Sequence, residues 1–186
     1  MMIFKRQKKN TYKETIKEYS AAVIYASGVS AENLRKEYEF SDETHMTVLI
    51  QFIGFSFIML ARKCASVQLA PERYQEITET VIGLLVNVVY ENIDNVDNVD
   101  NRQRAIKVIK ESVYKFVEVY GKLPVENDDP SKREAGTLLW EYGKLIAKTA
   151  TDEEKNIWAI MTCISLMKNQ ITATNPPIER MLSAMK

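Results

Sequence analysis

The sequence contains few of the residues on which most metal and catalytic sites depend. It has one histidine, His45, and two cysteines, Cys64 and Cys163, which lie far apart in the chain. A ferritin-like di-iron bundle takes two Glu-x-x-His pairs, and many zinc sites take several histidines. A single histidine excludes both kinds of site. We therefore predict no transition-metal site and no cofactor, and the sequence identifies no catalytic residue.

Glycine and proline are also scarce, with six and five residues. The glycines are isolated, so the chain lacks a phosphate-binding loop, a Gly-x-Ser-x-Gly elbow and a dinucleotide fingerprint. These absences exclude the usual nucleotide-dependent and serine-hydrolase chemistry. Few residues that break helices also mean few turns, which favours long secondary-structure elements.

Net charge is absent as well, because 25 basic residues balance 25 acidic ones. A dedicated nucleic-acid binder usually has a basic excess, so the sequence gives no clear sign of a nucleic-acid partner. The balance is uneven, since residues 1–17 hold six bases and one acid, or +5, which leaves −5 for the remainder. We predict a basic N-terminal arm over residues 1–10, followed by one domain over residues 11–186. The arm is either a solubility tail or a contact with anionic lipid or nucleic acid, and it offers the one route to a membrane surface.

No apolar run is long enough to span a bilayer. The longest covers residues 46–61, which is 16 residues, whereas a spanning helix needs about 20. We expect this run to form a central core helix. No signal peptide is recognisable, and both cysteines lie in apolar stretches typical of buried, reduced thiols. The predicted localisation is cytoplasmic.

Apolar residues recur with the 3.6-residue period of helices, and no segment shows the alternation typical of strands. We predict an all-α fold: a bundle of about five long, mostly antiparallel helices with short terminal and connecting helices. Ser41, followed by two acids, is a strong N-cap signal. The predicted helices cover, approximately, residues 11–27, 30–39, 42–67, 71–92, 102–120, 130–150 and 151–171.

Residues that break or cap helices set several of these bounds. Gly28 is suited to the left-handed position after a helix, and Ser30 can cap the next one. Pro130 is expected to open a helix, and Thr151 with Glu154 forms a capping-box pattern. The consecutive prolines Pro176 and Pro177 predict a break before a short terminal turn.

Two polar features have an ordinary explanation that we favour. The loop from Asp94 to Asn101 repeats Asp-Asn-Val, and its carboxylates could attract calcium, but the spacing does not match an EF-hand. We favour a solvated loop. His45 follows Asp42 and Glu43, and we expect a partly exposed side chain near those acids rather than a catalytic base.

The helix predicted over residues 130–150 is the most unusual. Gly136, Trp140 and Gly143 share one face, and a glycine inside a helix costs about 1 kcal/mol relative to alanine. Such a face favours close approach by a neighbouring helix or a partner subunit; the alternative is a small apolar pocket with Trp140 as a wall. We take this segment as the candidate ligand-binding or partner-binding site, with the residues Gly136, Trp140, Glu141, Gly143 and Lys144.

The same segment, which reads GTLLWEYGK, resembles one in a group of uncharacterised bacterial all-helical proteins. The resemblance extends loosely to the helix after Ser41. It implies a helical bacterial protein and carries no activity that could be transferred.

We therefore predict a non-enzymatic interaction module, a homodimer or a binder of another protein. The reason is that the helices predicted over residues 42–67, 71–92 and 151–171 are apolar around much of their circumference. Two alternatives stay open. One is a helical pocket that binds a small apolar ligand or lipid, and the other is an enzyme that uses carboxylates such as Glu79 or Glu141.

Overall fold

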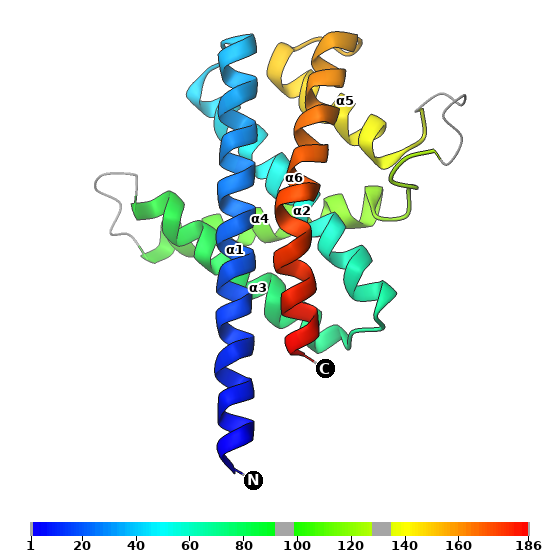
Figure 1. Ribbon diagram of the computed structural model, residues 1–186. Helices are drawn as coiled ribbons and strands as arrows, with labels where there is room; N and C mark the ends of the chain where they lie inside the picture. Colours follow the sequence, from blue (N-terminus) through cyan, green and yellow to red (C-terminus); the bar gives the residue numbers. More distant parts are fainter. Residues whose placement is uncertain (1, 92–98, 128–134, 186) are drawn as a thin grey trace.

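The computed structural model describes the backbone of residues 2–91, 99–127 and 135–185, and the side chains of residues 12–87, 103–127 and 135–185. Within these residues the chain forms six α-helices packed as a bundle, and no strand (Figure 1). The predicted all-α fold is confirmed. The helix bounds differ from the prediction at several places, and each difference has a local cause.

The first helix, α1 (Met2–Tyr38), is continuous and longer than predicted. The expected break at Gly28, with a new helix from Ser30, is wrong. The buried face of α1 continues past the glycine, because Ser27, Ala31 and Leu34 are all fully buried. Burial of this face outweighs the loss of about 1 kcal/mol that a helical glycine carries.

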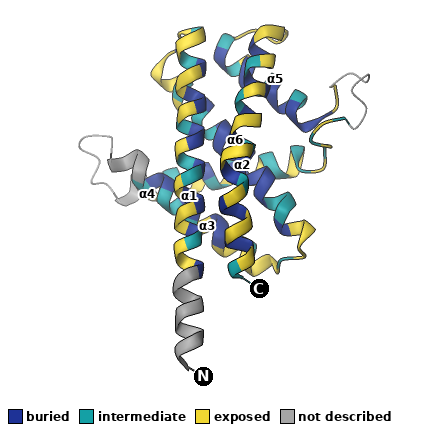
Figure 2. Ribbon diagram, viewed as in Figure 1, coloured by how far each residue is buried: buried dark blue, intermediate teal, exposed yellow. Residues whose placement is uncertain are grey.

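The second helix, α2 (Asp42–Ser66), is the central core helix that the apolar run predicts (Figure 2). Ser41 caps it, and its side-chain oxygen accepts a hydrogen bond from the backbone N–H of Thr44. One side of α2 places Phe55 in a cluster with α5 and α6, and the other places Phe57 in a cluster with α1, α3, α4 and the end of α6. By length and composition α2 could cross a membrane, but 61% of its most apolar window is buried inside the protein.

The next two helices are α3 (Pro71–Glu91) and α4 (Val99–Tyr120), and both agree with the prediction to within three residues. Arg62 of α2 binds the backbone just after the end of α4. Its Nη1 donates hydrogen bonds to the carbonyl oxygens of Gly121 and Leu123, at 3.0 and 2.6 Å. The Asp94–Asn101 loop, which we expect to be solvated, lies mostly outside the described residues, and α4 already begins at Val99.

Helix α5 (Leu138–Thr151) begins later than we predicted. Pro130 lies outside the described residues, whereas Thr137 is the N-cap, with its hydroxyl accepting from the N–H of Trp140. The predicted capping box at Thr151 is wrong, because Thr151 is the last residue of α5. The left-handed backbone of Asp152, at φ 57°, ends that helix, and Asn156 caps the next.

Helix α6 (Ile157–Ala184) continues through Pro176 and Pro177, so the predicted break is wrong. Two prolines remove two backbone donors and favour a kink. The helix persists because the turns after the prolines are held in the core, where Ile178 and Met181 are fully buried.

A buried amide joins three helices near the middle of the bundle. Gln170 of α6 has its Nε2 within 2.9 Å of Ser27 Oγ on α1, and within 2.6 and 2.7 Å of Ser56 Oγ and the Phe52 carbonyl on α2. Polar contacts of this kind fix the register in which α1, α2 and α6 pack.

Candidate functional site

The two glycines of the small-residue face predicted from the sequence do not lie on one helix in the structure. Gly136 precedes α5 and has a left-handed backbone, at φ 84°, so it is not a helical glycine. Gly143 does lie within α5 and is buried. A Cβ added there would lie 3.3 Å from Ile164 Cγ1 and 3.5 Å from the Ile160 carbonyl oxygen, both on α6. The neighbour for which Gly143 leaves room is therefore a helix of the same chain.

The polar members of the predicted site form a local network at the start of α5. Glu141 Oε1 accepts from the N–H of Gly136 at 3.1 Å, and Glu141 Oε2 pairs with Lys144 Nζ at 2.5 Å. Partial burial opposes ionisation of Glu141, but these two donors outweigh it, and the pKa of Glu141 is lowered. The network stabilises the first turn of α5 and keeps the carboxylate ionised.

Glu141 and Lys144 also line a shallow depression of about 400 Å³ between α5, Tyr120 at the end of α4, and the α5–α6 connection. Its charged groups are largely paired, because Lys148 Nζ contacts Glu154 Oε1 at 2.6 Å. Trp140 is half-buried and packs against the core cluster that contains Tyr142 and Ile146. Trp140 therefore packs against the core. Of the five residues of the predicted site, Glu141 and Lys144 line the same depression.

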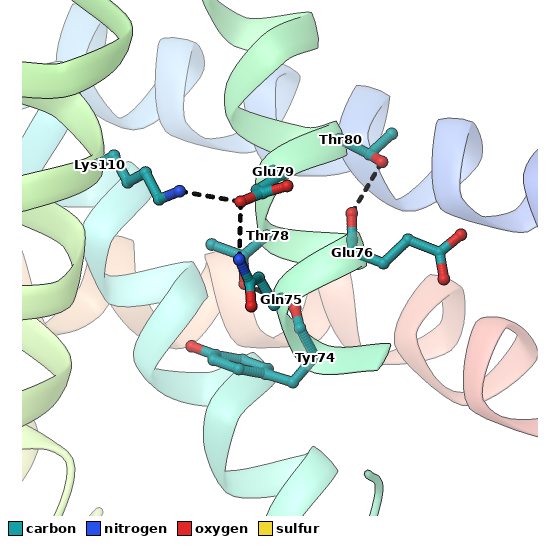
Figure 3. A network of polar contacts seen from close by, with 7 residues as sticks. All are labelled: Tyr74, Gln75, Glu76, Thr78, Glu79, Thr80 and Lys110. Carbon is teal, nitrogen blue, oxygen red and sulfur yellow. Dashed lines mark hydrogen bonds and ion pairs between the residues drawn. The ribbon is translucent and has the colours of Figure 1, made fainter. Parts of the chain in front are cut away.

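The carboxylates named for a possible enzyme do not form a catalytic pair. Glu79 of α3 is exposed, and its Oε1 accepts from Gln75 Nε2 at 3.0 Å and from Lys110 Nζ at 2.9 Å (Figure 3). These contacts, led by Gln75, lower the pKa of Glu79. None of the Asp and Glu side chains that the structure describes is buried. A carboxylate held protonated by burial in an apolar site, as in some enzymes that use a carboxylic general acid, is thus not found in the described part of the chain.

The lone histidine and the two thiols are in structural positions. His45 is half-buried, as expected, with its ring centroid 6.2 Å from that of Phe40. Both cysteines are free and buried, and burial raises the pKa of Cys64 to about 11 and that of Cys163 to about 12. At neutral pH both remain as thiols, which makes them poor nucleophiles. Among the residues with described side chains, no three His, Cys, Asp or Glu side chains are grouped as metal ligands.

The sequence prediction missed an exposed apolar surface at the start of α6. Ile157 is 61% exposed, Trp158 82% and Met161 49%. These residues lie within one and a half turns of the helix, at spacings of three and four residues that bring side chains together. We call this group the Trp158 surface. A signal for it was present, because the same face continues with the polar residues Ser165 and Lys168.

The Trp158 surface lies at an acidic end of the bundle. The α1–α2 connection and the α5–α6 connection meet at this end, opposite the N-terminus (Figure 1), and Thr162 of α6 donates to Glu37 of α1. Residues 35–43 and 148–155 contain seven acidic and four basic residues, a formal charge of −3. Ion pairs join Arg35 to Asp42 and Lys148 to Glu154. The five other carboxylates of these segments have no ion pair among the described residues.

Comparison of the chain with protein-family models, curated protein sequences and solved structures found no match.

Proposed function

We propose that this chain is a non-enzymatic interaction module that self-associates through the Trp158 surface. The single observation that carries the proposal is the exposure of Trp158, at 82%, beside two further apolar side chains. A lone exposed apolar residue is ordinary on a soluble protein, but a group that contains tryptophan is typical of interfaces.

The energetics support an anchoring role for Trp158. Complete burial of a tryptophan removes roughly 150–250 Å² from water, worth about 4–6 kcal/mol at ~25 cal/mol per Å². Association itself costs about 4–15 kcal/mol in lost freedom of motion. One tryptophan is therefore insufficient, and the neighbouring Ile157 and Met161 and the charges around them must contribute to a stable contact.

Sedimentation of the full chain across micromolar concentrations tests the proposal. We expect a concentration-dependent dimer that Trp158→Ala and Ile157→Ala both weaken by tenfold or more. Val108→Ala is the matched control, since Val108 is 57% exposed but lies on α4. A wild-type chain that remains monomeric, or a dimer that Trp158→Ala leaves unchanged, would overturn the proposal.

A second candidate, binding of a small apolar ligand, is supported by a groove between α1 and α3. The groove has a volume of about 580 Å³, within the usual range for ligand sites, and its lining includes Ala21, Ile24, Tyr25 and Leu84. It lies away from Trp140, which the alternative interpretation of the sequence made the wall of such a pocket. Fluorescence of an environment-sensitive apolar dye tests this candidate: Ala21→Trp should abolish the signal by filling the groove. Equal dye binding by the variant excludes the groove as the site.

A further inference from the structure

The Trp158 surface is unsuited to pair with a second copy of itself. Its apolar centre is bordered by connections with a formal charge of −3, so a symmetric contact would bring two acidic ends together. Like charges held close together oppose association. The preferred occupant is therefore apolar and basic.

The N-terminal segment of the chain has this chemistry. Residues 1–9 read MMIFKRQKK, which is four apolar residues followed by four cations in five positions. The apolar residues match the Trp158 surface, and the cations match the carboxylates around it. A cation placed over the indole ring is attracted by the electron-rich face of the ring.

The geometry excludes docking of this segment onto its own acidic end. Helix α1 is continuous over 37 residues, from Met2 to Tyr38. At about 1.5 Å per residue it separates the N-terminal segment from the acidic end by roughly 50 Å. Figure 1 shows the N-terminus and the α1–α2 connection at opposite ends of the molecule. A contact between these two parts must therefore join two chains.

We propose, building on the function proposed above, that the basic N-terminal segment of a second copy docks on the Trp158 surface. Two copies placed antiparallel bring each N-terminal segment to the acidic end of the other. Both sites are then occupied in a closed dimer, whereas a head-to-tail arrangement would leave one site open at each end. Because charge attraction contributes, raised salt should weaken the dimer.

A charge-swap experiment on the full chain tests this inference. In variant A, Lys5, Arg6, Lys8 and Lys9 are replaced by Glu; in variant B, Glu37, Glu39, Asp152 and Glu153 are replaced by Lys. Each variant alone should be monomeric at concentrations where the wild-type chain is dimeric. Mixed together, they should form an A–B heterodimer, because both segment-to-surface contacts again join opposite charges.

The outcomes separate this inference from the function on which it rests. A monomeric wild-type chain overturns both. If Trp158→Ala weakens the dimer but variant A dimerises as well as the wild-type chain, the inference is overturned and the proposed function is not. Failure of the mixture to form a heterodimer also overturns it, provided that circular dichroism shows both variants to be folded. Matched replacement of Lys13 and Lys17 by Glu is the control and should leave the dimer in place.

Discussion

Replacement of Gly54 by alanine gives a sharp test of how the helices cross. Gly54 lies in α2, where α4 and α5 approach it. A Cβ at this position would overlap Phe116 Cδ2 of α4 and lie 2.7 Å from Tyr142 Oη of α5. Tyr142 is fully buried, and its hydroxyl donates a hydrogen bond of 2.7 Å to the carbonyl oxygen of Gln51.

The expected loss of stability follows from three contributions. Alanine would improve helix propensity by about 1 kcal/mol. Overpacking opposes this by about 1–3 kcal/mol, and displacement of Tyr142 from its buried hydrogen bond costs about 1–3 kcal/mol more. We therefore expect Gly54→Ala to lower the free energy of unfolding by roughly 1–5 kcal/mol. In a chain of this length that corresponds to a fall of roughly 2–20 °C in Tm.

Gly28→Ala is the matched control, because a Cβ at Gly28 meets no atom within 4 Å. It should stabilise the protein by up to about 1 kcal/mol. Urea unfolding followed by circular dichroism measures both variants. If Gly54→Ala is as stable as the wild type, the close crossing of α2, α4 and α5 is wrong. Addition of Phe116→Leu should recover part of the lost stability by making space for the new methyl group.

Three further predictions concern packing and pH. Gly143→Ala should destabilise the protein by up to about 1 kcal/mol in urea unfolding, less than Gly54→Ala, because Ile164 Cγ1 at 3.3 Å can shift slightly; a rise in stability would show that α5 and α6 pack more loosely. Gln170→Ala should lower the free energy of unfolding by about 2–4 kcal/mol through a cavity and lost hydrogen bonds, and a change under 1 kcal/mol would contradict this. The pKa of Cys64 is raised to about 11 and that of Cys163 to about 12, so the folded state retains protons that the unfolded state loses. The free energy of unfolding should fall between pH ~9 and ~12 in urea titrations, and Cys163→Ala should reduce that slope; a slope unchanged in this variant would refute the assignment.

The sequence predicts the helices well where local signals and burial agree. Ser41 caps α2, and Pro71 opens α3, as expected. The apolar run over residues 46–61 is the core helix that its length suggests, because α2 is enclosed by other helices. In these places helix propensity, capping and tertiary packing favour the same structure.

The wrong predictions arise where packing outweighs a local signal. Gly28 and the pair Pro176 and Pro177 have strong helix-ending preferences, yet each lies within a helix whose buried face continues beyond it. The sequence shows how strongly a residue tends to end a helix, but it does not show how deeply the surrounding helix is buried in the core. Gly54 illustrates the same gap, because its neighbours Phe116 and Tyr142 come from segments more than 60 residues away.

The candidate site was missed for a related reason. Helix α6 is rich in apolar residues, and in the sequence only the later polar residues Ser165 and Lys168 mark the face that the bundle leaves exposed. Ile160 and Ile164 face the core, whereas Ile157 and Met161 face solvent. Apolar residues only three positions apart on α6 therefore differ, one being packed in the core and the other exposed to solvent. Which of them are buried depends on where α1 and α5 lie against α6.

Because the Trp158 surface is exposed, substitutions on it should change self-association without changing the stability of the fold. Both core clusters are built around α2, and none of the three residues of the surface belongs to either. A substitution at an exposed position changes stability by about 0.5 kcal/mol or less. Trp158→Ala should therefore leave unfolding almost unchanged while it weakens self-association, and Gly54→Ala should reduce stability without touching the surface. A loss of both properties in Trp158→Ala would mean that the indole packs within the fold, and the argument for an interface at this end of the bundle would fail.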